Sequence, residues 1–182
     1  CHAAGLKLAY HNHDFEFEQF GDTNGYEILL NETDPSLVDF ELDLYWAVRA
    51  GHNPLDLFKQ LKNDNVVYAE FRFAPLQHVY KGLTPYEVVK AVNDATEEGI
   101  KLYGVEAGVI LCTLRHFTEE QSIETAELVK KFKGTHIVGF DIAANEAGFP
   151  INNHIKAFNL INEWGIPSTA HAGEAKGAES VW

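Results

Sequence analysis

The sequence predicts an α/β fold in which helices cover a parallel β-sheet of about six strands. Three observations predict it. Short runs of β-branched and aromatic residues alternate with longer segments of helical periodicity, turn residues mark the junctions, and 182 residues over six units give about thirty residues each. A complete eight-stranded barrel of such units takes roughly 200 residues or more. The sequence therefore predicts a single domain that is either an incomplete barrel or a doubly wound open sheet.

Six apolar runs are predicted to form the strands. They are short, rich in Val, Ile, Phe and Tyr, and bounded by turn residues, which is the pattern of buried strands. No G-x-G-x-x-G motif follows the first run, so the dinucleotide-binding form of the open sheet has no support. The runs cover residues 6–10, 37–42, 66–73, 104–111, 136–140 and 166–170.

Four segments between these runs carry the start and stop signals of helices. Three of them begin at or just after an Asn or Thr that can cap the N-terminus, and in two a Glu or Gln follows three residues later, the spacing of a capping box. A Gly closes three of them. The predicted helices cover residues 54–62, 84–98, 118–133 and 152–164.

The composition excludes several classes of partner. A net charge of -13 would repel phosphate over most of the surface, which argues against nucleic acid. No window approaches the ~18 apolar residues of a membrane span and no signal peptide is visible, so we expect a cytoplasmic protein. Two cysteines make no disulfide framework, whereas nine histidines with scattered carboxylates indicate a metal. The chain starts at Cys1 and contains no Met, so we expect both ends to be cut.

The first two predicted strands end in possible metal ligands. His11 and His13 are two positions apart, so they point to the same side of a strand and one metal ion could bind both. Hydrogen bonds to neighbouring groups are the alternative. On the next strand Asp43 lies nearest the C-terminal end, where active residues of parallel sheets gather, and is the predicted ligand. Asp39 and Glu41 are expected to face solvent or neighbouring charges.

The third and fifth strands end in charged residues that have structural explanations. Glu70 and Arg72 share one face, and a buried ion pair explains them better than catalysis does. After the fifth strand, Asp141 could line a site, and helix capping is an alternative explanation for Asn145 and Glu146.

The sixth strand ends in the segment His171-Ala172-Gly173-Glu174. A His at a strand end, followed by a turn of small residues and a Glu, places an imidazole and a carboxyl group around one point. A metal-activated water at His171, with Glu174 transferring protons, would be ordinary hydrolytic chemistry. An ordinary strand-to-helix turn, with Glu174 favouring the helix N-terminus, fits the residues equally well.

Residues 1–60 resemble the sugar phosphate isomerase/epimerase family of xylose-isomerase-like TIM barrels. The resemblance lies in GLKLAYHNHDFEF at residues 5–17 and DPSLVDFELDLYWAVRAG at residues 34–51. It implies a divalent metal held by acidic and His groups, with Asp43 as one ligand and His11, His13 or Glu16 around another. The family's further ligands have no match here.

Residues 61–182 resemble adenosine deaminase, a metal-dependent hydrolase built on a TIM barrel. The resemblance lies in DNVVYAEFRFAP at residues 64–75, LCTLRH at 111–116, VGFD at 138–141 and HAGE at 171–174. It implies that His171 binds zinc and that Glu174 protonates the purine ring. The family's opening H-x-H strand and its later strands with a His and an Asp pair have no match. A Gly that contacts the purine in the family corresponds to Ala144.

The two resemblances together predict an engineered chimera of barrel fragments, joined near residue 60 in a TIM-barrel-type parallel architecture. His11, His13, Asp43 and His171 could then ring one composite zinc pocket. The leading hypothesis is a scaffold with a vestigial metal pocket and little turnover. The alternatives are a zinc-dependent adenosine deaminase-like hydrolase that uses Glu174 and, more weakly, a metal-dependent sugar isomerase. The incomplete barrel would leave sheet edges open, so we expect a homo-oligomer, and a small-molecule ligand is possible.

Overall fold

The computed structural model describes residues 8–34, 36–63, 66–79, 82–175 and 177–181. The chain forms two compact units, one of residues 1–72 with 95–108 and the other of residues 73–94 with 109–182. Strand β5 (Tyr68–Phe73), helix α4 (Pro85–Tyr103) and strand β6 (Glu106–Leu114) each pass from one unit to the other. Among the described residues, no helix is long and apolar enough to span a membrane.

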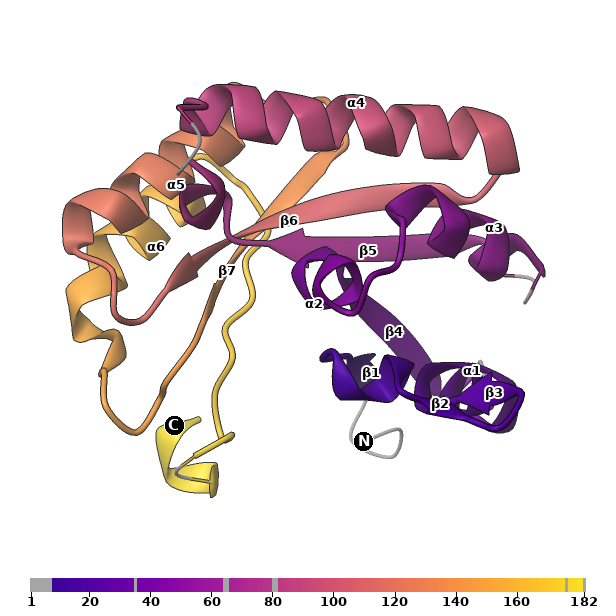
Figure 1. Cartoon of the computed structure of the whole chain (residues 1–182). Helices are drawn as coiled ribbons and strands as arrows, with labels where there is room; N and C mark the ends of the chain where they lie inside the picture. Colours follow the sequence, from indigo (N-terminus) through magenta and orange to yellow (C-terminus); the bar gives the residue numbers. More distant parts are fainter. Residues whose placement is uncertain (1–7, 35, 64–65, 80–81, 176, 182) are drawn as a thin grey trace. The chain divides into compact units, whose positions relative to one another are not determined.

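The first unit contains a parallel sheet with the strand order β1-β4-β5 (Figure 1). Strand β1 (Leu8–His11) pairs with β4 (Val38–Asp43), and Glu41 to Asp43 of β4 pair with Glu70 to Arg72 of β5. The start of β6 follows β5, because the amide of Glu106 donates to the carbonyl of Val67 at 3.2 Å. The predicted parallel architecture is confirmed here. The prediction for residues 6 and 7 lies outside the described residues.

Short elements of the first unit surround these strands. After β1 come the 3-10 turn η2 (Phe15–Phe17) and the antiparallel pair of β2 (Gln19–Phe20) and β3 (Thr23–Asn24). Helix α1 (Gly25–Glu32) begins after Asn24, whose side chain accepts the amide of Glu27 at 2.9 Å. The sequence did not predict α1 or α2, because α1 has only eight residues and α2 only six, about two turns of helix each. The remaining bounds are α2 (Leu44–Arg49) and α3 (Pro54–Asn63).

Helix α4 corrects one prediction in the first unit. Gly99 was expected to end this helix, yet the helix continues to Tyr103, and Gly104, with φ +69°, follows it. Gly99 packs against the buried ring of Phe58, where a Cβ atom would lie 2.8 Å from the ring carbons. The glycine is therefore explained by close packing inside the helix and not by termination.

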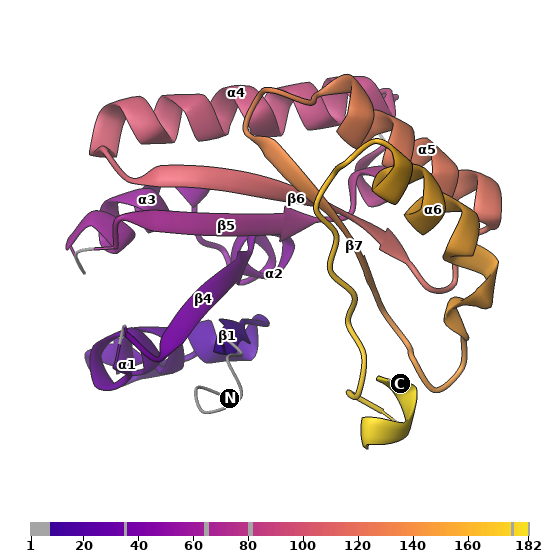
Figure 2. The same cartoon turned by 180° about the vertical axis from the view of Figure 1, so that it is seen from behind.

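The second unit pairs the greater part of β6 with β7 (Ile137–Ala143) in parallel and covers them with helices (Figure 2). Helix α5 begins with the predicted capping box: Thr118 and Gln121 exchange side-chain and backbone hydrogen bonds. Helices α5 and α6 are packed against each other. The remaining bounds are η3 (Pro75–His78), α5 (Glu119–Lys131), η4 (Ile151–His154), α6 (Ile155–Glu163) and η5 (Gly177–Ser180).

The sixth predicted strand, at residues 166–170, forms only an isolated parallel bridge between Phe140 and Ser168. The backbone of this segment still follows β7 closely. The amide of Phe140 donates to the Pro167 carbonyl at 3.1 Å, and the amide of His171 donates to the Ile142 carbonyl at 3.0 Å. Pro167 has no N–H to donate, which weakens the ladder at that point. The segment still carries His171 to the C-terminal end of β7.

Ala144, directly after β7, has a left-handed backbone with φ +80°. An L residue other than Gly pays about 1–2 kcal/mol there. We expect Ala144→Gly to raise the free energy of unfolding by about 0.5–1 kcal/mol, since the relief of strain exceeds the entropy cost of Gly. Urea denaturation measures this. Ala143→Gly is the matched control, because Ala143 is buried at the end of β7 and its loss should destabilise. Equal losses in both variants would contradict the expectation.

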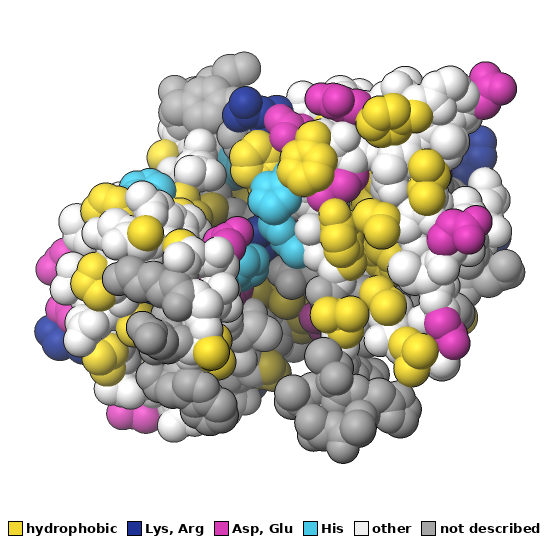
Figure 3. Space-filling view, turned by 90° about the horizontal axis from the view of Figure 1, so that it is seen from below, with side chains coloured by type: hydrophobic (Ala, Val, Ile, Leu, Met, Phe, Trp, Pro, Cys, Tyr) yellow, Lys and Arg dark blue, Asp and Glu magenta, His cyan; other side chains and the backbone are white. Residues whose placement is uncertain are grey.

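Apolar side chains are visible on the surface in Figure 3. The first unit exposes Phe15 and Phe20, and the second exposes Phe149, Ile151 and Ile155. Exposed apolar groups of this kind often mark association sites. Self-association of the chain stays a prediction.

Candidate active site

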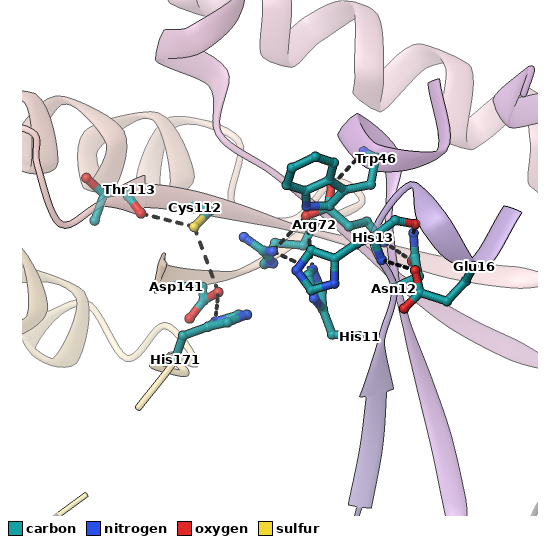
Figure 4. Close-up of polar contacts among 11 residues, drawn as sticks. His11, Asn12, His13, Glu16, Trp46, Arg72, Cys112, Thr113, Asp141 and His171 are labelled. Atoms are coloured by element: carbon teal, nitrogen blue, oxygen red, sulfur yellow. Dashed lines mark hydrogen bonds and ion pairs between the residues drawn. The ribbon is translucent and has the colours of Figure 1, made fainter. Parts of the chain in front are cut away.

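In the first unit, His11 and Asp43 lie together at the C-terminal ends of β1 and β4. Figure 4 shows His11 beside Arg72. The His11 Nε2 atom is 3.0 Å from Asp43 Oδ2. The guanidinium of Arg72, on β5, lies 2.7 Å from the same oxygen and 2.6 Å from His11 Nε2. A guanidinium can only donate, so Nε2 of His11 accepts from it. The cation held by these two predicted ligands is therefore Arg72.

The ring of His13 packs among other rings. It stacks on Phe15 with a centroid distance of 5.6 Å, lies 5.3 Å from Trp46 and meets His11 edge-on at 5.0 Å. Its backbone is held by buried Glu16, which accepts the His13 amide at 2.8 Å. The local turn after β1 therefore fixes His13 through packing and one buried carboxylate.

Sequence reasoning missed Asn12 and assigned Arg72 to the wrong partner. Asn12 is fully buried and its Oδ1 accepts the backbone amide of Asp43 at 2.8 Å, which ties β1 to the end of β4. Glu70, the expected partner of Arg72, accepts the Tyr68 hydroxyl instead at 2.7 Å. The side chains of Asp39 and Glu41 lie outside the described residues.

The turn after β1 also makes a pH-dependent contact. Burial, together with the hydrogen bond and the charge of Glu16, raises the pKa of Tyr10 to about 12. The folded state therefore holds this proton more tightly than the unfolded state, whose phenols titrate near pH 10. The stability that the contact contributes is complete below about pH 10 and disappears as the pH rises through about 12.

We expect a titration of tyrosinate absorbance to show late-titrating phenols, of which Tyr10→Phe removes one. Tyr68, whose pKa is raised to about 12 by burial and by Glu70, stays as the internal reference in that variant. A Tyr10→Phe curve that superimposes on the wild-type curve would contradict the assignment.

In the second unit, His171 points its ring at a carboxylate (Figure 4). Its Nδ1 atom lies 2.9 Å from Oδ2 of Asp141, which is 0% exposed, while 23% of the His171 side chain is exposed. The Cys112 thiol lies 3.8 Å from the same carboxylate oxygen. The backbone of His171 is also held, because buried Arg115 donates to its carbonyl at 2.7 Å.

This arrangement fixes both the ring and the backbone of His171. A carboxylate that accepts the Nδ1 proton leaves Nε2 as the nitrogen with a lone pair, which is how zinc-binding histidines are usually oriented. His171 therefore fits one zinc ligand. Glu174 follows on the exposed turn after it. Sequence reasoning named Asp141 as a possible site residue but did not link it to His171, since the two lie thirty positions apart and meet only through folding.

The predicted ligands fit zinc unequally. Within the described parts of the chain, no group of three or more His, Cys, Asp or Glu side chains is arranged to hold a metal ion. His11 and Asp43 hold Arg72, whereas His171 has the carboxylate partner of a zinc ligand. His11, His13 and Asp43 belong to one unit and His171 to the other, so the composite pocket stays a prediction.

Comparison with known proteins decides the family. The adenosine deaminase family model matches residues 31–182. The chain belongs to the adenosine deaminase family. The match starts ahead of the predicted junction near residue 60 and includes β4, whose end carries Asp43. The chimeric origin and the division of the chain at residue 60 stay predictions.

Individual relatives agree with this family. Adenosine deaminase 1 of Streptomyces coelicolor is 43% identical over 129 residues, which is 68% of this chain and 32% of the relative. A solved amidohydrolase from Burkholderia ambifaria with bound zinc has a TM-score of 0.62 at 22% identity, covering 66% of this chain and 33% of its own. The chain thus spans about a third of the length of each of these two relatives.

A sugar phosphate isomerase/epimerase from Parabacteroides distasonis covers 56% of this chain and 36% of its own, with a TM-score of 0.36 at 25% identity. A TM-score this low does not establish a shared fold for the first unit. The resemblance of residues 1–60 to that family stays a prediction.

Proposed function

We propose that this adenosine deaminase family chain carries the zinc-binding His and the proton-transferring Glu of a hydrolase that removes the amino group of adenosine-like purines. The observation that carries the proposal is the contact of His171 Nδ1 with Oδ2 of buried Asp141 at 2.9 Å. Glu174 follows His171 by three residues. Curated relatives named adenosine deaminases support it. They support this hydrolase over the inert engineered scaffold and over the sugar isomerase that the sequence also suggested.

The residues of the second unit divide the chemistry between them. Zinc bound by His171 would supply Lewis acidity that makes a water molecule nucleophilic near neutral pH. Asp141 accepts the Nδ1 proton of His171 and so leaves on Nε2 the lone pair that would bind the metal, and Arg115 fixes the His171 carbonyl. The carboxyl group of Glu174 gives a proton to the purine ring as the water adds, which is general acid catalysis. The carboxylate formed would then take one proton from the added water, and the other proton would pass to the amino nitrogen, which leaves as ammonia when its bond to the ring carbon breaks.

Loss of the buried carboxylate should weaken zinc binding. We expect Asp141→Asn to lower the affinity for zinc by about 10–100-fold, because an amide neither selects the same tautomer nor raises the basicity of the imidazole. Competition with a chromophoric chelator measures the affinity, and circular dichroism checks that the fold is kept. The matched control is Glu163→Gln, which alters an exposed carboxylate at the end of α6. An unchanged zinc affinity in Asp141→Asn would show that Asp141 does not orient a ligand.

One experiment tests the proposal directly. The full chain is incubated with one equivalent of zinc and adenosine, and release of ammonia is followed. We expect zinc-dependent release that a chelator abolishes and that His171→Ala eliminates together with zinc binding. His116→Ala is the control, because His116 is exposed on the turn after β6 and packs on Phe117. Bound zinc without any ammonia release, or equal release from His171→Ala, would overturn the proposal for this chain.

A further inference from the structure

We propose that Glu146 is a positioning residue that holds Glu174 in place, an inference that rests on the proposed function of Glu174. Glu146 is 5% exposed and lies in the turn after β7. One carboxylate oxygen accepts the amide of Gly173 at 2.8 Å, and the other accepts the amide of Ala175 at 2.7 Å. These two amides flank Glu174 in the sequence, so Glu146 binds the backbone on both sides of it.

Only a carboxylate can make this contact. An ionised Glu offers two acceptor oxygens, whereas Gln offers one acceptor and one donor that would face an N–H group. Hydrogen bonds to an ionised acceptor are also roughly twice as strong as neutral ones. The negative charge of Glu146 therefore strengthens its hydrogen bonds with the two backbone amides. The alternative suggested by the sequence, that Glu146 caps a following helix, is replaced by this contact with a distant turn.

The backbone of the turn explains how both amides reach one carboxylate. Gly173 has φ +81°, a left-handed conformation that favours glycine. A Cβ atom on Gly173 would also lie 3.1 Å from a methyl carbon of Val181. Glycine is therefore required for the turn, and the turn directs the amides of Gly173 and Ala175 toward Glu146.

The anchors of His171 and Glu174 are separate. Asp141 and Arg115 hold the ring and the carbonyl of His171, and Glu146 holds the peptide units around Glu174. All three anchors are buried and charged. The geometry between the zinc ligand and the proton-transferring carboxyl group is therefore set by three buried charges in the second unit. Loss of Glu146 should free Glu174 and leave His171 in place.

Glu146→Gln tests the anchor without reference to turnover. We expect amide hydrogen exchange at Gly173 and Ala175 to accelerate by about 10–100-fold, the effect of losing hydrogen bonds to a charged group. The NMR order parameter of the Glu174 amide should fall at the same time, and that of His171 should not. Glu127→Gln, an exposed carboxylate of α5, is the matched control and should change neither quantity. Unchanged exchange and order parameters in Glu146→Gln overturn the inference.

A second variant covers the case in which Glu146→Gln does not fold. Ala175→Pro removes one of the two donors from the exposed side of the turn and leaves the buried carboxylate intact. Its Gly173 and Glu174 signals should show the same direction of change. Unaltered signals in a folded Ala175→Pro protein count against the inference.

Turnover separates positioning from a merely structural role. With zinc bound and adenosine as substrate, Glu146→Gln should lower kcat by about 10–100-fold with KM within twofold, because a misplaced proton donor affects the chemical step. A mobile Glu174 with unchanged kcat overturns the positioning role. If the wild-type chain with zinc shows no turnover, the proposed function fails. The order parameter of Glu174 then decides the inference alone, with a fall supporting it and no change overturning it.

Discussion

Asp43→Ala is expected to lower the free energy of unfolding by about 3–5 kcal/mol, the usual cost of removing one partner of a buried ion pair. The Asp43 and Arg72 side chains are almost fully buried and approach to 2.7 Å. Without Asp43, the guanidinium of Arg72 keeps its charge, because its pKa is too high for neutralisation, and stays in a poorly solvated place. Urea denaturation followed by circular dichroism measures the loss.

Two further variants show whether burial of the charge is the cause. Asp94→Ala breaks an exposed ion pair with Lys90 on α4 and should cost only about 0.3–0.5 kcal/mol. The double variant Asp43→Leu with Arg72→Met removes both buried charges and should regain most of the stability that Asp43→Ala loses. A loss of less than about 1 kcal/mol in Asp43→Ala would show that Asp43 is solvated and available to a metal after all.

Local signals in the sequence predicted the helix starts well, whereas features that depend on long-range contacts were predicted wrongly. The Thr118 capping box is made by residues three positions apart, so its pattern is visible in the sequence and confirmed in the structure. The meaning of Gly99 depends on Phe58, forty-one positions away, and the helix therefore continues where a stop was expected. The run at 166–170 failed as a strand because a proline removed one ladder donor.

The candidate site also contains residues that a local sequence pattern predicts and residues that only long-range contacts bring to it. His171 and Glu174 could be found from sequence because a His and a Glu at a strand end, three positions apart, form a local pattern. Their anchors could not, because the contacts of Asp141, Arg115 and Glu146 with this turn join residues 27 or more positions apart. Charged residues at the ends of neighbouring strands are a signal that such anchors exist, but the sequence does not say which partner each one takes.

Glu174→Gln is expected to lower the proposed activity strongly while zinc stays bound. Gln has the shape of Glu but no carboxyl proton to give, so kcat for zinc-dependent release of ammonia from adenosine should fall by about 100–10,000-fold, the usual contribution of general acid–base catalysis. Zinc affinity should stay within about threefold, because His171 keeps its anchors at Asp141 and Arg115. Initial rates and chelator competition on the same sample measure the two quantities.

The pairing of these two measurements gives Glu174→Gln its diagnostic value. A ligand variant such as His171→Ala should lose zinc and turnover together, whereas a proton-transfer variant should lose turnover alone. Glu124→Gln, on the exposed side of α5, is the matched control and should retain both. Full turnover in Glu174→Gln would remove the catalytic role of this carboxyl group. Loss of zinc in the same variant would instead make Glu174 a metal ligand, and the proton would then have to come from another group.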